Sequence, residues 1–218
     1  MARDNHPRDR QAAKLKRKQG TRPPYDRVLI VCEGEKTEPN YFDEIRVQLR
    51  IPTAHVQIMP SALGTQPRQV VDYAVEKFGE SREFDIVYAV FDRDDHDTYH
   101  DGLAQAGRLN ETLKNDEKKK VPFFAVPSIP CFELWVLIHF IEIHAFADRH
   151  TIIGRLKTYI ADYEKGRRGV FALTASNLNV AMERAVRLRE QFSRHNDEDL
   201  YTSIDEVVTK LLSLRPAR

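Results

Sequence analysis

Cysteine is scarce in this sequence, and long apolar runs are missing from it. Cys32 and Cys131 are the only cysteines, and they form neither the CxxC pairs of a zinc site nor a disulfide framework, so we expect two reduced, structural thiols. No stretch approaches the roughly 20 apolar residues that span a bilayer, and the first residues lack the apolar segment of a secretory signal. We therefore expect a cytoplasmic protein that does not associate with membranes.

Two common nucleotide-binding and metal-binding motifs are also missing. The sequence has no GxxxxGKS or GxxxxGKT loop, so any dependence on ATP would have to come from a partner protein. His139, His144 and His150 are not arranged as HExxH, which argues against a zinc enzyme. Hydrophobic residues make up 41% of the chain and charged residues 31%, which indicates a folded globular protein.

Positive charge is concentrated in residues 1–24, which we expect to form a flexible basic arm. Eight basic side chains accompany two acidic ones there, a net charge of about +6, which leaves about −5 for the rest because the whole chain carries +1. Such an arm can neutralise nucleic-acid phosphates, although many tails are basic for solubility alone. Its candidate nucleic-acid contacts are Arg10, Lys14, Lys16, Arg17 and Lys18.

The residues after this arm alternate between short apolar strands and amphipathic helices. Strands are predicted at 28–32, 55–59, 86–91 and 121–126, and helices at 39–49, 67–79 and 102–118. This order predicts an α/β fold with a mainly parallel sheet flanked by helices, whose ligands gather at the carboxyl ends of the strands.

The pattern after Pro130 is mostly helical. Helices are predicted at about 130–146, 151–165, 176–194 and 204–214, and an arginine-rich loop covers 166–169. We therefore divide the chain into the arm at 1–24, a catalytic core at 25–140, and a helical extension at 141–218 that packs on the core.

Carboxylates follow two of the predicted strands. Glu33 comes directly after the first strand, and Asp92 and Asp94 follow the strand that ends at Phe91. Carboxylates that crowd one edge of a sheet repel one another, so their presence is easiest to explain if a divalent cation neutralises them. Oxygen ligands of this kind favour Mg²⁺ or Mn²⁺, the ions used in phosphoryl transfer. A single aspartate after a strand would be explained equally well by a helix cap or a turn, so the prediction depends on the two acidic segments together.

Three segments of the sequence resemble the motifs of RloB-like proteins: VLIVCEGEKTEPNYF, VFDRDDH and PCFELWVLIHF. The resemblance covers roughly residues 26 to 140, with a weaker similarity in TSIDEVVTKLL. It implies a Toprim-like fold, in which a glutamate after the first strand and a DxD after the third hold catalytic Mg²⁺. By that analogy Glu33, Asp92 and Asp94 are the metal ligands.

The resemblance also implies a function and a partner. RloB-like proteins are associated with bacterial antiviral defence loci of the abortive-infection type, often beside an ATPase partner. The chain is therefore expected to be a magnesium-dependent nuclease that hydrolyses phosphodiester bonds of DNA or RNA.

Two positions depart from the family pattern. Thr37 stands four residues after Glu33, where a further acidic residue is usual, and Glu38 stands one residue later. A second metal ion held by Glu38 is therefore less well supported, although Glu38 and Asp95 remain the further candidate ligands. Ile129 replaces an asparagine that commonly precedes Pro130.

Other side chains near the two acidic segments are candidates for supporting roles. Lys36 could stabilise charge on phosphate oxygens, and His96 could transfer protons or bind metal, although both could equally be solvated loop residues. Glu35 is a weaker candidate of the same kind. Glu133 lies in the first turn of a predicted helix, where the helix dipole alone would explain it, and the family motif adds a supporting role at the site.

Two alternative functions remain open at this point. A small-molecule phosphohydrolase or phosphotransferase would use the same carboxylates and metal, because a fold alone does not identify a substrate. A non-catalytic, nucleic-acid-binding regulatory module would also explain the basic arm. A receiver-like version of it would need an aspartate after the first strand, where this chain has Glu33.

Overall fold

The computed structural model describes residues 25–93, 97–192 and 200–216. The basic side chains predicted to contact nucleic acid, at 10, 14 and 16–18, lie outside the described residues, as do Asp94, Asp95 and His96. No helix in the described ranges is long and apolar enough to cross a bilayer.

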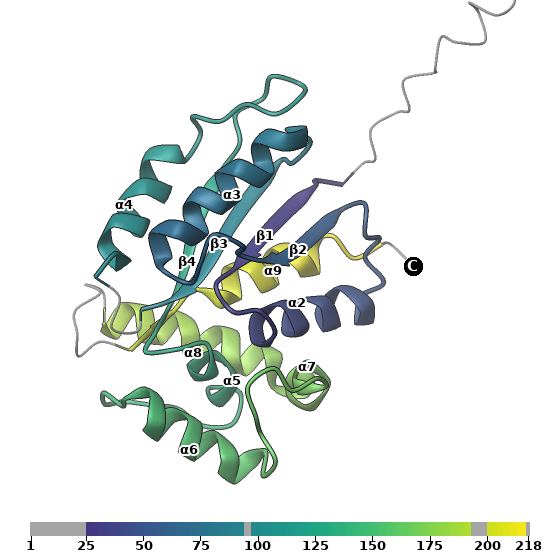
Figure 1. Cartoon of the computed structure of the whole chain (residues 1–218). Coiled ribbons are helices and arrows are strands. Elements are labelled where there is room, and N and C mark those ends of the chain that lie inside the picture. Colours follow the sequence, from purple (N-terminus) through teal and green to yellow (C-terminus); the bar gives the residue numbers. More distant parts are fainter. Residues whose placement is uncertain (1–24, 94–96, 193–199, 217–218) are drawn as a thin grey trace, which may run out of the picture.

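The described residues form one sheet of five strands in the order β2-β1-β3-β4-β5 (Figure 1). Its strands are β1 (Val28–Cys32), β2 (Val56–Pro60), β3 (Ile86–Asp92), β4 (Phe123–Ile129) and β5 (Tyr201–Thr202). The first four strands run parallel, and β5 pairs antiparallel with β4. The predicted α/β fold with a mainly parallel sheet is confirmed.

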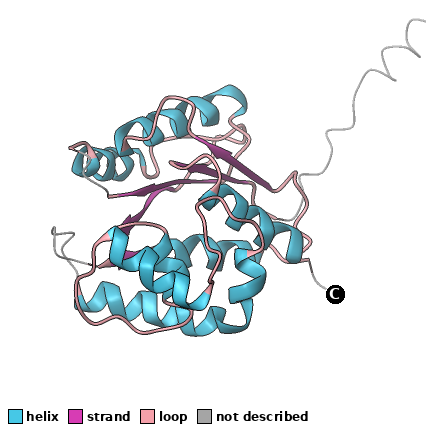
Figure 2. Cartoon of the chain, turned by 60° about the horizontal axis from the view of Figure 1, so that its bottom comes forward, coloured by secondary structure: helices cyan, strands magenta, loops and turns pink. Residues whose placement is uncertain are grey.

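Helices cover both faces of the sheet, as Figure 2 shows. One layer contains α3 (Pro67–Ser81) and α4 (Tyr99–Leu109). The other contains α2 (Thr37–Gln48), α5 (Glu133–Leu137), α6 (Arg149–Tyr159), α7 (Val170–Thr174), α8 (Leu178–Gln191) and α9 (Ile204–Ser213), with a 3₁₀ turn at Ala175–Asn177 between α7 and α8.

The buried strand β1 shows why the sheet has two cores. All five of its residues are buried, and successive side chains of a strand point to opposite faces. Leu29 and Val31 pack with α3 and α4, whereas Val28 and Ile30 pack with the larger helical layer. A continuous apolar run is expected for a parallel strand covered on both faces.

The chain after residue 140 contributes to this larger core and to the sheet. Apolar residues of α6, α8 and α9 belong to the same buried cluster as β1 and α2. Strand β5, which was not predicted, pairs through Thr202 and Tyr201 with Ser128 and Ile129 at the end of β4. Its two residues are too few to give a recognisable alternation.

Several predicted helix lengths were wrong. Helix α4 ends at Leu109 rather than 118, because Glu111 and Lys118 adopt positive φ angles and the chain turns back toward β4. Helix α5 spans Glu133–Leu137 rather than 130–146. The chain after α5 forms 3₁₀-type turns, because the N–H groups of His139 and Phe140 bond the carbonyl groups three residues earlier.

Candidate functional site

A pocket of about 310 Å³ opens where β1 and β3 end. It is lined by the β1–α2 connection at residues 33–38, by Asp92 at the end of β3, and by side chains and backbone from the later helices and loops. The latter are Phe132, Glu133, Arg149, Lys165 and Gly166. The pocket therefore lies at the carboxyl ends of parallel strands, where α/β sheets usually bind their ligands.

Glu33 and Asp92 are joined directly across the two strand ends. The backbone N–H of Asp92 donates a 2.7 Å hydrogen bond to Glu33 Oε2, and the backbone N–H of Glu33 donates to the carbonyl oxygen of Val90 at 2.8 Å. Since an aspartate carboxyl carbon lies within about 4 Å of its own backbone nitrogen, Glu33 Oε2 lies within about 7 Å of the Asp92 carboxyl group. This separation is short enough for both carboxylates to bind one hydrated cation.

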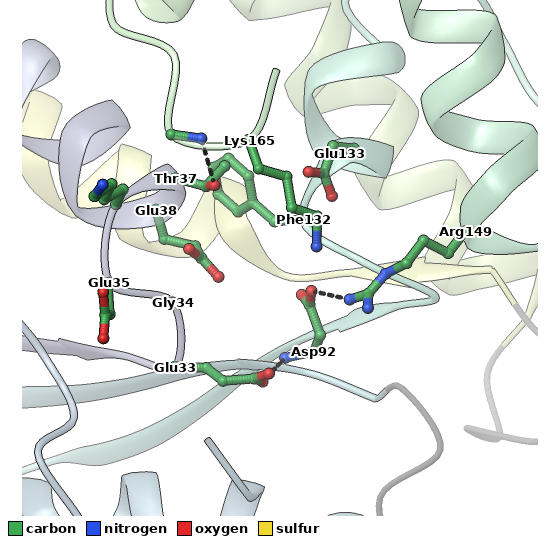
Figure 3. Close-up of a pocket in the computed structure, with 12 residues that line it drawn as sticks. Glu33, Gly34, Glu35, Thr37, Glu38, Asp92, Phe132, Glu133, Arg149 and Lys165 are labelled. Atoms are coloured by element: carbon green, nitrogen blue, oxygen red, sulfur yellow. Dashed lines mark hydrogen bonds and ion pairs between the residues drawn. The ribbon is translucent and has the colours of Figure 1, made fainter. Parts of the chain in front are cut away.

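Two further carboxylates are buried beside this pair. Glu38 and Glu133 are 5% and 1% exposed, and Figure 3 shows their carboxylates and that of Asp92 pointing toward the same space. Gly34 permits this arrangement, because a Cβ atom at that position would collide with the carboxylate of Glu38. Glu38, one of the predicted ligands, thus lies in the site despite its displaced position in the sequence.

Burial and crowding change the pKa values of Asp92 and Glu38. Burial raises the pKa of Asp92 well above its usual value, and the negative charges of Glu38, Glu33 and Glu133 raise it further. Burial also raises the pKa of Glu38 to about 7, with Glu133 adding to the effect and Lys165 opposing it. Both groups would release protons more readily if a cation were bound between them.

Arg149 supplies positive charge inside the pocket. Its Nη2 atom lies 3.0 Å from Asp92 Oδ2, and the side chains are 28% and 9% exposed. The position of Arg149 follows from Asp148, whose side chain accepts a hydrogen bond from the Thr151 N–H and so caps α6. Arg149 was not among the predicted site residues, because a capping signal marks the start of a helix but not the contact of Arg149 with a residue 57 positions earlier.

A loop from the later part of the chain lies against the pocket and is held by α2. The Gly166 N–H donates to Thr37 Oγ1 at 2.9 Å, and Asn40 Nδ2 donates to the Gly166 carbonyl oxygen at 2.8 Å. Further along the loop, Glu44 accepts the N–H groups of Gly169 and Phe171 at 2.5 and 2.9 Å. Three positions of one helix thus fix the loop that carries Lys165.

Two lysines from different parts of the chain lie in the site, the predicted Lys36 and Lys165. Lys36 and Lys165 both line the pocket and are exposed. Arg168 lines a neighbouring pocket of about 430 Å³, with Asn40 and Arg46 among its other residues. The sequence marks this loop as basic but does not reveal that it runs from one pocket to the next.

Tyr163, which was not among the predicted residues, holds Glu133 in place. Its hydroxyl group donates a 3.2 Å hydrogen bond to Glu133 Oε1, and both side chains are buried. Burial and the charge of Glu133 raise the pKa of Tyr163, so it stays a donor. No periodicity in the sequence marks this contact, because it joins a loop residue to a helix 30 positions earlier.

The chemistry of these donors fits a hard divalent cation. Glu33, Glu38, Asp92 and Glu133 offer only oxygen atoms, which is the ligand type preferred by Mg²⁺ and Mn²⁺. Within the described ranges, no three His, Cys, Asp or Glu side chains are already gathered as a metal-binding group. Three of the predicted residues, Asp94, Asp95 and His96, are outside those ranges.

Comparisons with known proteins identify the family. Neither the curated proteins nor the solved structures contain a match to this chain. The family model described as RloB-like protein matches residues 28–211, which extends well past the segments at 26–140 that carry the resemblance. The chain therefore belongs to the RloB-like protein family.

Proposed function

We propose that this protein is a metal-dependent nuclease that hydrolyses phosphodiester bonds of DNA or RNA. One observation carries the proposal: the carboxylates of Glu33, Glu38, Asp92 and Glu133 line one pocket at the carboxyl ends of β1 and β3, where the Asp92 N–H donates a 2.7 Å hydrogen bond to Glu33 Oε2. Buried carboxylates that raise one another's pKa are costly in a metal-free protein, so a function that uses them is the simplest reason for their presence.

The four carboxylates would hold Mg²⁺ or Mn²⁺. When bound, such an ion lowers the pKa of an attacking water and neutralises charge on phosphate oxygens. The Glu33 N–H bonds the carbonyl oxygen of Val90, and the Glu33 side chain accepts the Asp92 N–H, so the two strand ends are tied together. Glu38 carries a proton part of the time near neutral pH and would release it as the ion binds.

Cationic side chains beside the pocket support a phosphate-bearing substrate. Lys36 and Lys165 line the pocket and are exposed to solvent, so they can attract phosphates to it. Arg168, three residues beyond Lys165 in the same loop, lies in the neighbouring pocket and extends this positive charge. A substrate with several phosphates would contact both pockets, which favours a nucleic acid over a small phosphate ester.

The biological setting of this proposal comes from the family. On the basis of membership in the RloB-like family, we also propose a role in anti-phage defence and an ATPase partner protein. The basic side chains Arg10, Lys14, Lys16, Arg17 and Lys18 would add sequence-independent attraction to nucleic acid.

The proposal is tested by incubating the purified full chain with labelled DNA and RNA, with Mg²⁺, Mn²⁺ or EDTA. We expect cleavage of one or both polymers with a metal ion and none with EDTA, and we expect Asp92→Ala to abolish cleavage. The matched control is Asp72→Ala, which removes a carboxylate on α3 that pairs with Arg68 on the surface.

Other results of the same experiment would reject the proposal. Cleavage that persists in Asp92→Ala would indicate a contaminating nuclease. Hydrolysis of small phosphate esters without cleavage of either polymer would favour the phosphohydrolase alternative, and metal-independent binding of polymer without cleavage would favour a regulatory module.

A further inference from the structure

Arg149 is a charged group in the pocket that the chemistry described above does not use. Its guanidinium lies 3.0 Å from Asp92 Oδ2, and it belongs to α6, far from Asp92 in the sequence. Helix α6 is fixed independently of this contact, because Ile152 and Leu156 are fully buried and Asp148 caps its first turn. A change in the position of the guanidinium would therefore not require the helix to move.

The guanidinium of Arg149 and a divalent cation would compete for the same carboxylate. Glu33, Glu38 and Glu133 surround Asp92 and raise its pKa, and the positive charge of Arg149 opposes this rise. A divalent ion bound to Asp92 would take the oxygen that Arg149 contacts and would repel the guanidinium at close range. The side chain of Arg149 is 28% exposed, so its charged end can turn toward the open side of the pocket.

A phosphate group is the natural partner for a guanidinium displaced in this way. The planar guanidinium donates two parallel hydrogen bonds to phosphate oxygens, which a lysine does not. We propose that Arg149 holds the place of the metal ion at Asp92 until the ion binds, and then binds a phosphate of the substrate. This inference rests on the proposed function, because it needs both a metal ion and a phosphate substrate at this pocket.

The first test measures Mn²⁺ affinity without substrate, by calorimetry on the full chain. We expect Arg149→Gln to bind Mn²⁺ about fivefold more tightly than the parent protein, because a competitor for Asp92 is removed. The matched control is Arg155→Gln, which removes the same charge from an exposed position of α6 outside the pocket. We expect the control to retain the affinity of the parent.

The second test measures binding of a labelled single-stranded oligonucleotide to the same variants in Ca²⁺, a metal ion chosen to limit turnover, and in EDTA. We expect Arg149→Gln to weaken binding about tenfold in Ca²⁺, where the guanidinium is released to contact phosphate, and much less in EDTA. Arg149→Lys keeps the charge but loses the paired hydrogen bonds. It should retain the Mn²⁺ affinity of the parent and show weaker oligonucleotide binding in Ca²⁺.

The outcomes separate this inference from the proposed function. If the parent binds no Mn²⁺, or binds it as well as Asp92→Asn does, the proposed function fails and the inference fails with it. If the parent binds Mn²⁺ through Asp92 but Arg149→Gln binds it equally or more weakly, only the inference is overturned. If Arg149→Gln does not fold, an Arg149→Lys variant with unchanged oligonucleotide binding in Ca²⁺ overturns it instead.

Discussion

Glu33 accepts the backbone N–H of Asp92 through its side chain, so one 2.7 Å hydrogen bond joins the ends of β1 and β3. The contact uses one carboxylate oxygen of Glu33 and leaves the carboxylate of Asp92 to Arg149 and the pocket. The two residues are therefore expected to act differently when each is neutralised. Glu33 both positions the strand end and offers charge, whereas Asp92 offers charge alone.

Asp92→Asn is predicted to abolish stabilisation of the protein by metal. For the parent, Mg²⁺ or Mn²⁺ at about 100 times its dissociation constant should raise the free energy of unfolding by about 2.7 kcal/mol. For Asp92→Asn the increase should be lost, while the metal-free variant should be at least as stable as the metal-free parent, because a buried charge has been removed. Thermal unfolding with EDTA and with saturating metal measures both effects. An equal metal-induced increase in both proteins would contradict the assignment.

Glu33→Gln is predicted to be less stable than Asp92→Asn in the absence of metal. The amide oxygen of glutamine can still accept the Asp92 N–H, but the bond is no longer charge-assisted, and we expect a loss of about 1 kcal/mol in the free energy of unfolding. Urea denaturation in EDTA compares the two variants. A Glu33→Gln protein as stable as Asp92→Asn would show that the hydrogen bond contributes little.

Glu38 is predicted to make the metal-free protein less stable as pH rises. Its pKa in the folded protein is raised to about 7 from 4.5, so folding favours the protonated form. The contribution of protonated Glu38 to the free energy of unfolding is complete below about pH 4.5, declines as pH rises toward 7, and is lost above 7. The difference between the two pKa values corresponds to a change of order 3 kcal/mol in the free energy of unfolding.

The Glu38→Gln variant isolates this effect. Urea denaturation in EDTA between about pH 5 and about pH 8 should show a decline for the parent that is clearly smaller for Glu38→Gln. Glu35→Gln is the matched control, because it neutralises an exposed glutamate of the same connection and should retain the decline of the parent. Parallel pH profiles for the parent and Glu38→Gln would show that Glu38 is not the titrating group.

The fold and the first half of the site were predictable because they depend on local patterns. The continuous apolar run of β1 indicated a strand buried on both faces, and the chain order of strands and helices indicated parallel pairing. Once the strands are parallel, Glu33 and Asp92 must lie at the same edge of the sheet. Their proximity is therefore a consequence of topology rather than of a specific contact.

The second half of the site depends on contacts that no local pattern encodes. Arg149 and Lys165 line the pocket, and Tyr163 bonds Glu133 beside it, because α6 and the following loop pack beside α5. This packing is determined by the whole core. Glu38 shows the same dependence on tertiary structure. It stands one residue away from the usual family position, but the first turn of α2 still directs its side chain into the buried site. Which charges share a pocket is decided by tertiary structure.

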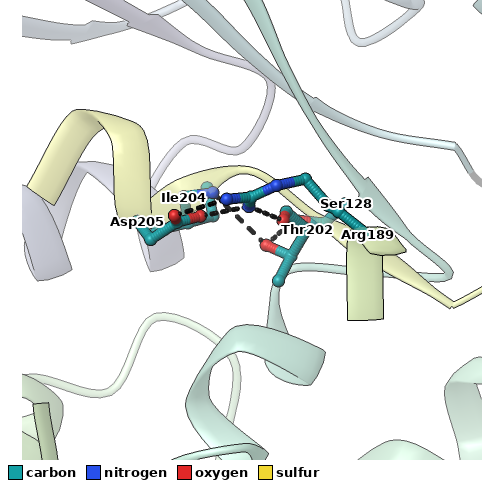
Figure 4. A network of polar contacts seen from close by, with 5 residues as sticks. All are labelled: Ser128, Arg189, Thr202, Ile204 and Asp205. Carbon is teal, nitrogen blue, oxygen red and sulfur yellow. Dashed lines mark hydrogen bonds and ion pairs between the residues drawn. The ribbon is translucent and has the colours of Figure 1, made fainter. Parts of the chain in front are cut away.

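An ion pair between half-buried Arg189 and buried Asp205 is predicted to hold the end of the chain against the sheet. Arg189 on α8 donates to both oxygens of Asp205 at 2.5 and 2.7 Å and to the carbonyl oxygen of Thr202 at 2.7 Å (Figure 4). Thr202 in turn contacts Ser128 of β4 at 3.2 Å. This network ties α8, β5 and α9 to the strand beside Asp92.

Arg189→Met should lower the free energy of unfolding by about 3 kcal/mol, because it leaves the Asp205 carboxylate buried without its charged partner. The double variant Arg189→Met with Asp205→Leu should recover most of this loss, because no charge remains buried. Arg187→Met is the matched control on the same helix, since its partner Glu142 is 41% exposed and a surface pair contributes about 1 kcal/mol or less. A double variant as unstable as Arg189→Met would show that the loss comes from side-chain packing.

The loop held by α2 is predicted to carry part of the nucleic-acid contact. Lys165 and Arg168 are exposed in adjacent pockets. A nucleic-acid strand that enters the pocket lined by Glu33 and Asp92 would pass both side chains. Each phosphate that a basic side chain neutralises releases counterions and makes binding more sensitive to salt. The number of contacts can therefore be counted from the salt dependence of binding.

Lys165→Ala combined with Arg168→Ala should weaken binding of single-stranded DNA or RNA, with the slope of log affinity against log salt reduced by about 1.4. Lys114→Ala combined with Lys119→Ala removes the same charge just before β4, at the opposite edge of the sheet, and should leave the slope of the parent unchanged. Because both double variants change the net charge equally, a difference between them reports position rather than total charge. Equal slopes for the two variants would mean that nucleic acid does not follow the loop past the carboxylate pocket.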